Sequence, residues 1–196
     1  MTKEALIAKT VAYVEMHMAG ESTGHDIHHV RRVYQMALNL SKGLEVDILT
    51  ISLASLLHDL DDYKISKDTN KARDFLKNNC PEQEEKVMNI IDNMSFSSHK
   101  QGKSVNTMEG KIVQDADRLD ALGAIGIARC FAYTGKVGRP IYNNNKDDVS
   151  GIAHFYQKLL DLKDLMNTDK GRKIAIERTE FMKNYLERFF KEWKGE

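Results

Sequence analysis

The stretch from Ser55 to Lys64 reads Ser-Leu-Leu-His-Asp-Leu-Asp-Asp-Tyr-Lys, and it predicts the fold around it. Leucines before and within it recur at i, i+4, i+7, i+8 and i+11, the core-facing stripe of a buried helix: Leu49, Leu53, Leu56, Leu57 and Leu60. His58 and Asp59 therefore stand side by side where an apolar helix ends. A buried charge without a partner is unfavourable, and a bound metal ion is one way to satisfy both groups. The alternative is a hydrogen-bonded core histidine beside a solvated aspartate.

Length, charge and cysteine content limit the class of protein. With 196 residues, the chain favours one domain, spanning residues 1–196. Charged residues make up 30% and the formal net charge is +0, so the overall charge favours neither nucleic acid nor a membrane as partner. Only Cys80 and Cys130 occur, which favours a reducing compartment over a disulfide framework. Without a signal peptide or a run of roughly 18 apolar residues, we expect a soluble cytoplasmic protein.

Helical spacing dominates the chain, and only two prolines interrupt it, so the sequence predicts an all-α fold of about eight or nine helices. Apolar periodicity and capping residues place helices at residues 3–18, 26–43, 70–78, 81–94, 107–121, 152–166 and 169–193. A further helix begins near residue 47 and runs into the stretch quoted above, and another ends near residue 135. Polar loops are expected at 95–106 and 135–149. The second loop is long enough to be a candidate substrate lid.

Adjacent histidines near the start of the second expected helix differ in helical phase. His29 shares a face with apolar residues and points at the core, whereas His28 shares a face with polar residues and points at water. His25 lies one turn before His29, at the mouth of the same face. The alternative for His29 is a core histidine satisfied by hydrogen bonds. We take His28 to be a solvated side chain.

A second acidic candidate lies in residues 113–121, Val-Gln-Asp-Ala-Asp-Arg-Leu-Asp-Ala. Asp117 shares a helix face with small residues, which leave room around an inward-pointing carboxylate. Asp115 shares a face with larger apolar residues, and an inward orientation of its side chain is also open. Helical phase therefore favours Asp117 only weakly. Asp120 lies one turn further on, where it is a candidate for orienting a ligand or a substrate group.

Together His29, His58, Asp59 and Asp117 form a His, His-Asp, Asp series that resembles the HD-domain superfamily of metal-dependent phosphohydrolases. Further segments look like one bacterial branch of stand-alone HD hydrolases and cover nearly the whole chain. These segments are residues 24–33, 57–64, 113–121, 138–141, 154–160 and 168–178. The block Asp-Ala-Asp-Arg-Leu-Asp-Ala-Leu-Gly-Ala-Ile-Gly, residues 115–126, is specific, whereas a lone His-Asp pair is not.

The resemblance implies a compact helical fold in which His29, His58, Asp59 and Asp117 hold a divalent metal ion between core helices. Two imidazoles and two carboxylates favour Mn²⁺, with Mg²⁺, Co²⁺, Ni²⁺ or Fe²⁺ as alternatives. The implied reaction cleaves nucleoside or deoxynucleoside triphosphates to monophosphate and pyrophosphate through a metal-activated water. Branches with two metals carry further histidines between the His-Asp pair and the last aspartate. Only His99 lies there, so a second metal is unsupported.

Other polar residues have candidate roles within that reaction. Asp62 is the candidate for orienting the water or moving its proton, and Lys64 for contacting a phosphate. The alternative for this pair is a solvated acid and base after a helix. His25 is a candidate phosphate contact, and surface charge is the alternative for the remaining candidate substrate contacts, which are Arg118, Arg139, His154 and Lys158.

Other functions of the same fold are alternatives. A phosphomonoesterase or phosphodiesterase would act on another nucleotide. A di-iron oxygenase would need ligands beyond His99, and an intact ligand set argues against a non-catalytic nucleotide-binding module. The expected partner is a small-molecule nucleotide, with no nucleic acid and no membrane, and the sequence leaves a homodimer open.

Overall fold

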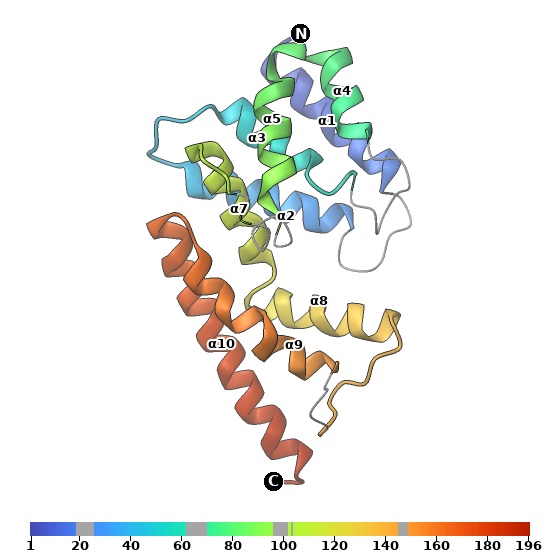
Figure 1. Cartoon of the computed structure of the whole chain (residues 1–196), viewed down its shortest axis with the longest axis vertical. Coiled ribbons are helices and arrows are strands. Elements are labelled where there is room, and N and C mark those ends of the chain that lie inside the picture. The colour runs from blue at the N-terminus through green and yellow to red at the C-terminus, as the bar shows by residue number, and fades with distance from the viewer. Residues whose placement is uncertain (19–25, 62–69, 96–101, 103, 145–148) are drawn as a thin grey trace. The chain divides into compact units, whose positions relative to one another are not determined.

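The computed structural model describes residues 1–18, 26–61, 70–95, 102, 104–144 and 149–196. Within these ranges it has nine α-helices, one 3-10 helix and no strand, which confirms the predicted all-α class (Figure 1). The chain divides into two compact units, Met1–Asp117 and Arg118–Glu196, and helix α7 (Met108–Asp120) spans the division. That residues 1–196 act as a single domain stays a prediction.

The N-terminal unit is built around α3 (Ile48–Leu57), in which every residue from Leu49 to Leu57 is buried. Helices α1, α2 and α5 pack against α3, and α4 packs against α5 (Figure 1). The bounds are Lys3–His17 for α1, Ile27–Ser41 for α2, Lys71–Asn79 for α4 and Pro81–Met94 for α5. A helix that is buried on all sides ends inside the core. The leucine pattern therefore brings His58 and Asp59 into the interior.

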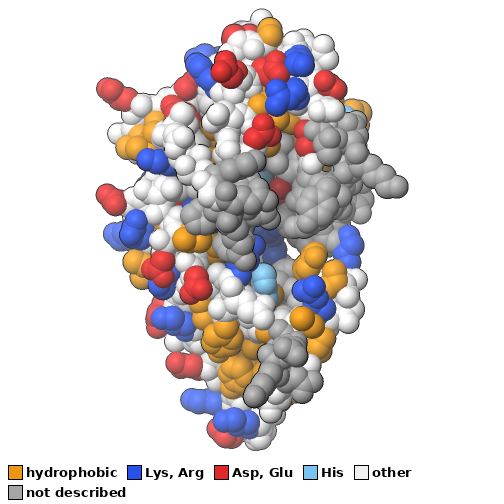
Figure 2. Space-filling model, in the orientation of Figure 1, with side chains coloured by type: hydrophobic (Ala, Val, Ile, Leu, Met, Phe, Trp, Pro, Cys, Tyr) orange, Lys and Arg blue, Asp and Glu red, His pale blue; other side chains and the backbone are white. Residues whose placement is uncertain are grey.

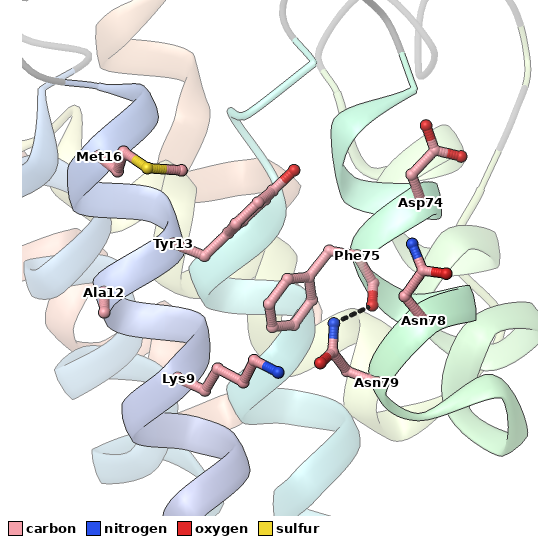
Figure 3. Close-up of a pocket in the computed structure, with 8 residues that line it drawn as sticks. All are labelled: Lys9, Ala12, Tyr13, Met16, Asp74, Phe75, Asn78 and Asn79. Carbon is pink, nitrogen blue, oxygen red and sulfur yellow. Dashed lines mark hydrogen bonds between the residues drawn. The ribbon is translucent and has the colours of Figure 1, made fainter.

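Helices α1 and α4 meet through two aromatic rings. The ring centroids of Tyr13 and Phe75 lie 4.7 Å apart, and the Tyr13 hydroxyl donates to the carbonyl oxygen of Lys71 at 3.4 Å. Beside these rings lies a groove of about 450 Å³ (Figure 3). Its lining residues are Lys9, Ala12, Tyr13, Met16, Asp74, Phe75, Asn78 and Asn79. None of them is a predicted site residue, so this groove does not enter the candidate site.

The C-terminal unit is organised along the long helix α10 (Asp169–Trp193). Helix α8 (Gly123–Lys136) and the 3-10 helix η1 (Leu159–Leu165) contact α10, and α9 (Gly151–Gln157) contacts η1 and α8. Aromatic rings join three of these helices, since the centroids of Phe131, Phe155 and Tyr185 lie 5.9–6.2 Å apart. Among the described helices, none combines the length and the apolar character that crossing a membrane requires.

The predicted helix over residues 152–166 is wrong, because two shorter elements replace it. Helix α9 ends at Gln157, and Lys158 leaves the helical region with φ −149° and ψ −54°. From there leucines recur at positions 159, 162 and 165, which matches the three residues per turn of a 3-10 helix. Lys158 therefore lies outside the helix that contains His154. The other predicted helices occur close to their expected bounds.

The turn between α7 and α8 requires glycine at two positions. Gly123 has φ +70°, in the left-handed region, and a Cβ there would lie 3.1 Å from the side chain of Arg178. At Gly126 a Cβ would lie 2.2 Å from the carbonyl oxygen of Ala121, so a larger residue does not fit without movement. The Gly-Ala-Ile-Gly sequence thus sets the sharp exit from α7, the helix that contains Asp117.

Both cysteines are buried, and this predicts their reactivity. Burial is the main cause that raises the pKa of the Cys80 and Cys130 thiols, each to about 11. Because the thiolate is the reactive form, we expect neither thiol to react with Ellman's reagent in the native protein at neutral pH. Both should react in guanidinium chloride. Rapid modification of the native protein would contradict the observed burial, and Cys80→Ser and Cys130→Ser variants would identify the exposed thiol.

Candidate metal centre

Four side chains from three helical segments converge in the N-terminal unit. His29 lies in the first turn of α2, where the Asp26 carboxylate accepts a hydrogen bond from the His29 backbone N–H at 2.8 Å. This cap fixes where α2 begins and therefore where the imidazole points. His58 is the C-cap residue that follows Leu57, the last residue of α3, and Asp59 comes next. Asp117 lies in α7.

Nε2 of His29 has all three other side chains near it. It lies 3.2 Å from Nε2 of His58, 3.2 Å from Oδ2 of Asp59 and 3.5 Å from Oδ1 of Asp117. Nε2 of His58 lies 3.4 Å from Oδ1 of Asp59 and 3.8 Å from Oδ1 of Asp117. Ligand atoms of His29, His58 and Asp59 thus all lie within 4.8 Å of one another, and Asp117 approaches both imidazoles from α7. Divalent cations in proteins bind this mixture of nitrogen and oxygen ligands.

The backbone holds the His58 ring in a defined orientation. Its Nδ1 lies 2.9 Å from the carbonyl oxygen of Ser55, which accepts a hydrogen bond from a protonated nitrogen. This contact assigns the proton of the neutral ring to Nδ1, so Nε2 presents its lone pair to the cluster. Metal-binding histidines usually donate from their other nitrogen in this way.

The burial of the four side chains indicates whether a cation fits among them. The exposed fractions of the side chains are 1% for His29, 3% for His58, 12% for Asp59 and 33% for Asp117. Two carboxylates that each lie within 3.5 Å of Nε2 of His29 concentrate negative charge with little solvent to stabilise it. A divalent cation would remove that imbalance, so the residues present fit a metal ion. The more exposed Asp117 leaves the cluster accessible to solvent on its side.

The structure distinguishes alternatives that helical phase left open. His28 is exposed and His29 is fully buried, as the phase of α2 predicts. Asp117 reaches the cluster, whereas Asp115 is fully buried on a different face of α7. That the clustered side chains bind a metal ion stays a proposal.

Several predicted residues lie outside the described part of the chain. These are His25, Asp62, Lys64 and His99. Their roles therefore stay predictions from sequence.

Three predicted substrate contacts lie near one another in the C-terminal unit. His154 is half-buried on α9, and its pKa lies below the usual value because of burial and the positive charges of Lys158 and Arg139. The group thus combines a largely neutral imidazole with two cations at neutral pH. Arg118 has an additional structural contact, since it is buried and donates to the carbonyl oxygen of Leu165 in η1.

Asp120 forms a largely buried ion pair with Arg129. The Arg129 Nη1 donates to Oδ2 of Asp120 at 3.0 Å, and the contact joins α7 to α8. Arg178 donates to the carbonyl oxygen of Leu119 at 2.5 Å. Burial lowers the pKa of Arg178, against the opposing effect of the Asp120 charge. The predicted role of Asp120 in orienting a ligand or a substrate group stays a prediction.

Sequence reasoning missed two contacts around the cluster. Ser55 acts through its backbone carbonyl, which any residue at that position would supply. Asp61 accepts hydrogen bonds from the backbone N–H groups of Lys71 and Ala72 at 2.8 and 3.1 Å, and so caps α4. No local spacing rule reports this contact, because its partners lie ten and eleven residues further along the chain.

Comparison with known proteins gives the family. Residues 26–122, which include all four clustered side chains, match the family model described as HD domain. The protein YpgQ of Bacillus subtilis is 39% identical over 190 residues, covering 93% of this chain and 91% of YpgQ.

Solved structures agree with this assignment over the full length. An HD-superfamily hydrolase from Bacillus thuringiensis is 42% identical with a TM-score of 0.81, and the match covers 100% of both chains. Bacillus subtilis YpgQ in complex with ADP is 36% identical with a TM-score of 0.83, covering 98% of this chain and 97% of that chain. The chain therefore belongs to the HD domain superfamily, whose hydrolase fold supports metal-dependent phosphohydrolysis.

Proposed function

We propose that this protein hydrolyses nucleoside or deoxynucleoside triphosphates to the monophosphate and pyrophosphate in a reaction that depends on a divalent metal ion. The observation that carries the proposal is the convergence of the four side chains, with 3.2–3.8 Å between their nitrogen and oxygen atoms. Membership of the HD superfamily supports hydrolysis of a phosphate ester or anhydride. The complex of the relative YpgQ with ADP supports a nucleotide as substrate.

The ligands of the ion would be Nε2 of His29 and His58 and carboxylate oxygens of Asp59 and Asp117. This donor set favours Mn²⁺, with Mg²⁺, Co²⁺, Ni²⁺ or Fe²⁺ as alternatives. When bound, the cation supplies Lewis-acid chemistry, which lowers the pKa of water and neutralises charge on phosphoryl oxygens. The Ser55 carbonyl keeps Nε2 of His58 available, because it holds the ring proton on Nδ1.

Asp62 and Lys64 complete the proposed chemistry near the His-Asp pair. Asp62, three residues after Asp59, orients the attacking water or accepts its proton. Lys64 contacts a phosphate oxygen as a point charge. Phosphoryl transfer depends mainly on positioning and on electrostatic stabilisation, so one carboxylate and one ammonium are a sufficient set for these tasks.

The proposed contacts to the substrate phosphates include three cations. Arg139 and Lys158 supply two positive charges. Both charges act on His154, whose imidazole in its neutral form has one hydrogen-bond donor and one acceptor. Arg118, which also donates a hydrogen bond to the carbonyl oxygen of Leu165, is a third proposed cationic contact. His25 is the remaining proposed phosphate contact.

We expect the protein with Mn²⁺ to release pyrophosphate from at least one nucleoside or deoxynucleoside triphosphate. Chelation should abolish hydrolysis, and Mn²⁺ should restore it better than Zn²⁺, because Zn²⁺ prefers closed tetrahedral sites. The measurement is a nucleotide screen in which the monophosphate, pyrophosphate and orthophosphate are separated by anion-exchange chromatography.

The product pattern distinguishes the alternatives. Orthophosphate as the only phosphate product would indicate a phosphomonoesterase. Undiminished hydrolysis in chelator would exclude a metal-dependent reaction, and a requirement for oxygen would favour the di-iron alternative.

The adjacent histidines of α2 provide a matched pair of variants. His29→Ala removes a buried imidazole whose Nε2 faces the cluster, so bound metal and activity should be lost together. His28→Ala removes an exposed side chain and should retain both. Metal content per chain and steady-state kinetics measure the two effects. Retention of metal in His29→Ala would remove that residue from the ligand set.

Asp62 and Asp117 should separate chemistry from metal binding. Asp117→Ala should reduce bound metal and lower the melting temperature in Mn²⁺, since metal stabilises the native state by mass action. Asp62→Asn should keep the metal and lower kcat by about 10²- to 10⁴-fold, with little change in KM. Near-normal kcat in Asp62→Asn would remove Asp62 from the mechanism, and loss of metal would make it a ligand.

A further inference from the structure

Asp61 joins the metal cluster to a helix that contains none of its ligands. It follows Asp59 by two residues, and both of its carboxylate oxygens accept backbone hydrogen bonds. Oδ1 accepts from the N–H of Lys71 at 2.8 Å, and Oδ2 accepts from the N–H of Ala72 at 3.1 Å. Lys71 and Ala72 are the first two residues of α4, where N–H groups have no partner within the helix.

This contact has the geometry of a strong cap. A carboxylate at a helix N-terminus is favoured by the positive end of the helix dipole, and charge-assisted hydrogen bonds are shorter and stronger than neutral ones. Because two oxygens bind two successive N–H groups, the carboxylate of Asp61 is fixed in orientation as well as in distance. Its backbone is thereby held against the start of α4.

Helix α4 is itself firmly packed, so it can serve as an anchor. Ala72, Phe75 and Leu76 are buried, and α4 packs against α5. The Phe75 ring lies beside that of Tyr13 from α1, and both are visible in Figure 3. The Tyr13 hydroxyl also donates to the carbonyl oxygen of Lys71, one of the two residues that Asp61 caps.

The other end of the connection is Asp59. Leu60 between the two aspartates is 1% exposed, and its N–H donates to the carbonyl oxygen of Leu57 at 3.1 Å. Two residues span at most about 7 Å, so fixing Asp61 and Leu60 leaves the backbone of Asp59 little freedom. The carboxylate of Asp59 lies 3.2 Å from Nε2 of His29. The backbone of Asp59 is held by α3 on its N-terminal side and by the Asp61 cap on its C-terminal side.

We infer that Asp61 is a positioning residue, which holds the Asp59 carboxylate in the metal centre by tying the chain to the N-terminus of α4. The inference rests on the proposed metal-binding function. The engagement of both Asp61 oxygens with backbone N–H groups favours this role over proton transfer to or from the substrate water.

The test compares Asp61 with an aspartate that caps a different helix. Asp47 accepts from the N–H groups of Leu49 and Thr50 at the start of α3, at the opposite end of that helix from His58. Asp61→Ala and Asp47→Ala both remove a carboxylate cap and should both lower the melting temperature of the metal-free protein. Only Asp61→Ala should weaken Mn²⁺ binding, by about 10- to 100-fold, as loss of a residue supporting a ligand usually does.

Two readouts respond to ligand position rather than to stability. Free Mn²⁺ is measured by electron paramagnetic resonance, and the visible absorption of bound Co²⁺ reports the coordination geometry. The Co²⁺ spectrum should change in Asp61→Ala and stay unchanged in Asp47→Ala. Asp61→Asn, which keeps one acceptor oxygen, should lie between wild type and Asp61→Ala, and it supplies the same comparison if Asp61→Ala does not fold.

The outcomes separate this inference from the proposed function. Wild-type protein that binds neither Mn²⁺ nor Co²⁺ would overturn the metal centre and the role of Asp61 with it. Wild-type protein that binds Mn²⁺, together with unchanged affinity and an unchanged Co²⁺ spectrum in the Asp61 variants, would overturn only the role of Asp61. Equal weakening in the Asp47 and Asp61 variants would also overturn it, because the effect would then follow stability alone.

Discussion

The complete burial of α3 is the constraint on which the rest of the site depends. Because residues 49–57 are all buried, the helix ends within the core, and His58 and Asp59 leave it there. An imidazole and a carboxylate in that position lose most of their hydration, which is unfavourable unless other groups compensate. His29 lies within 3.2 Å of both, and Asp117 lies 3.5 Å from His29 and 3.8 Å from His58, so the polar end of an apolar helix becomes part of a cluster that fits a cation.

Aspartates at helix N-termini set the positions of these groups. Asp26 caps α2 and so orients His29 three residues later. Asp61 caps α4 just after Asp59. A cap of this kind stabilises a helix by about 0.5–2 kcal/mol. The caps made by Asp26 and Asp61 lie beside clustered residues, so the same hydrogen bonds that stabilise the fold also help to position those side chains.

The sequence predicts those parts of the structure that depend on local periodicity. Helical phase separates buried His29 from exposed His28, and the leucine spacing identifies α3. Phase alone could not choose between Asp115 and Asp117, because both are candidates for an inward face and only the contacts of Asp117 with His29 and His58 distinguish them. The expected helix over residues 152–166 fails at Lys158, since an i, i+3 leucine pattern fits an α-helix and a 3-10 helix alike. Contacts between distant segments, such as Asp61 with α4, have no periodic signature.

In the C-terminal unit, His154 lies close to two positive charges. Burial and the charges of Lys158 and Arg139 hold the pKa of His154 below its usual 6.5, so its protonated form is disfavoured in the folded protein. Like charges that gather around one imidazole repel one another, and a bound phosphate would reverse the balance by attracting all three groups. The same phosphate would favour the protonated form of His154, because an opposite charge nearby raises the pKa of an imidazole. For the proposed reaction, the triphosphate of a nucleotide carries several negative charges, and Arg139 and Lys158 are cations that would attract them.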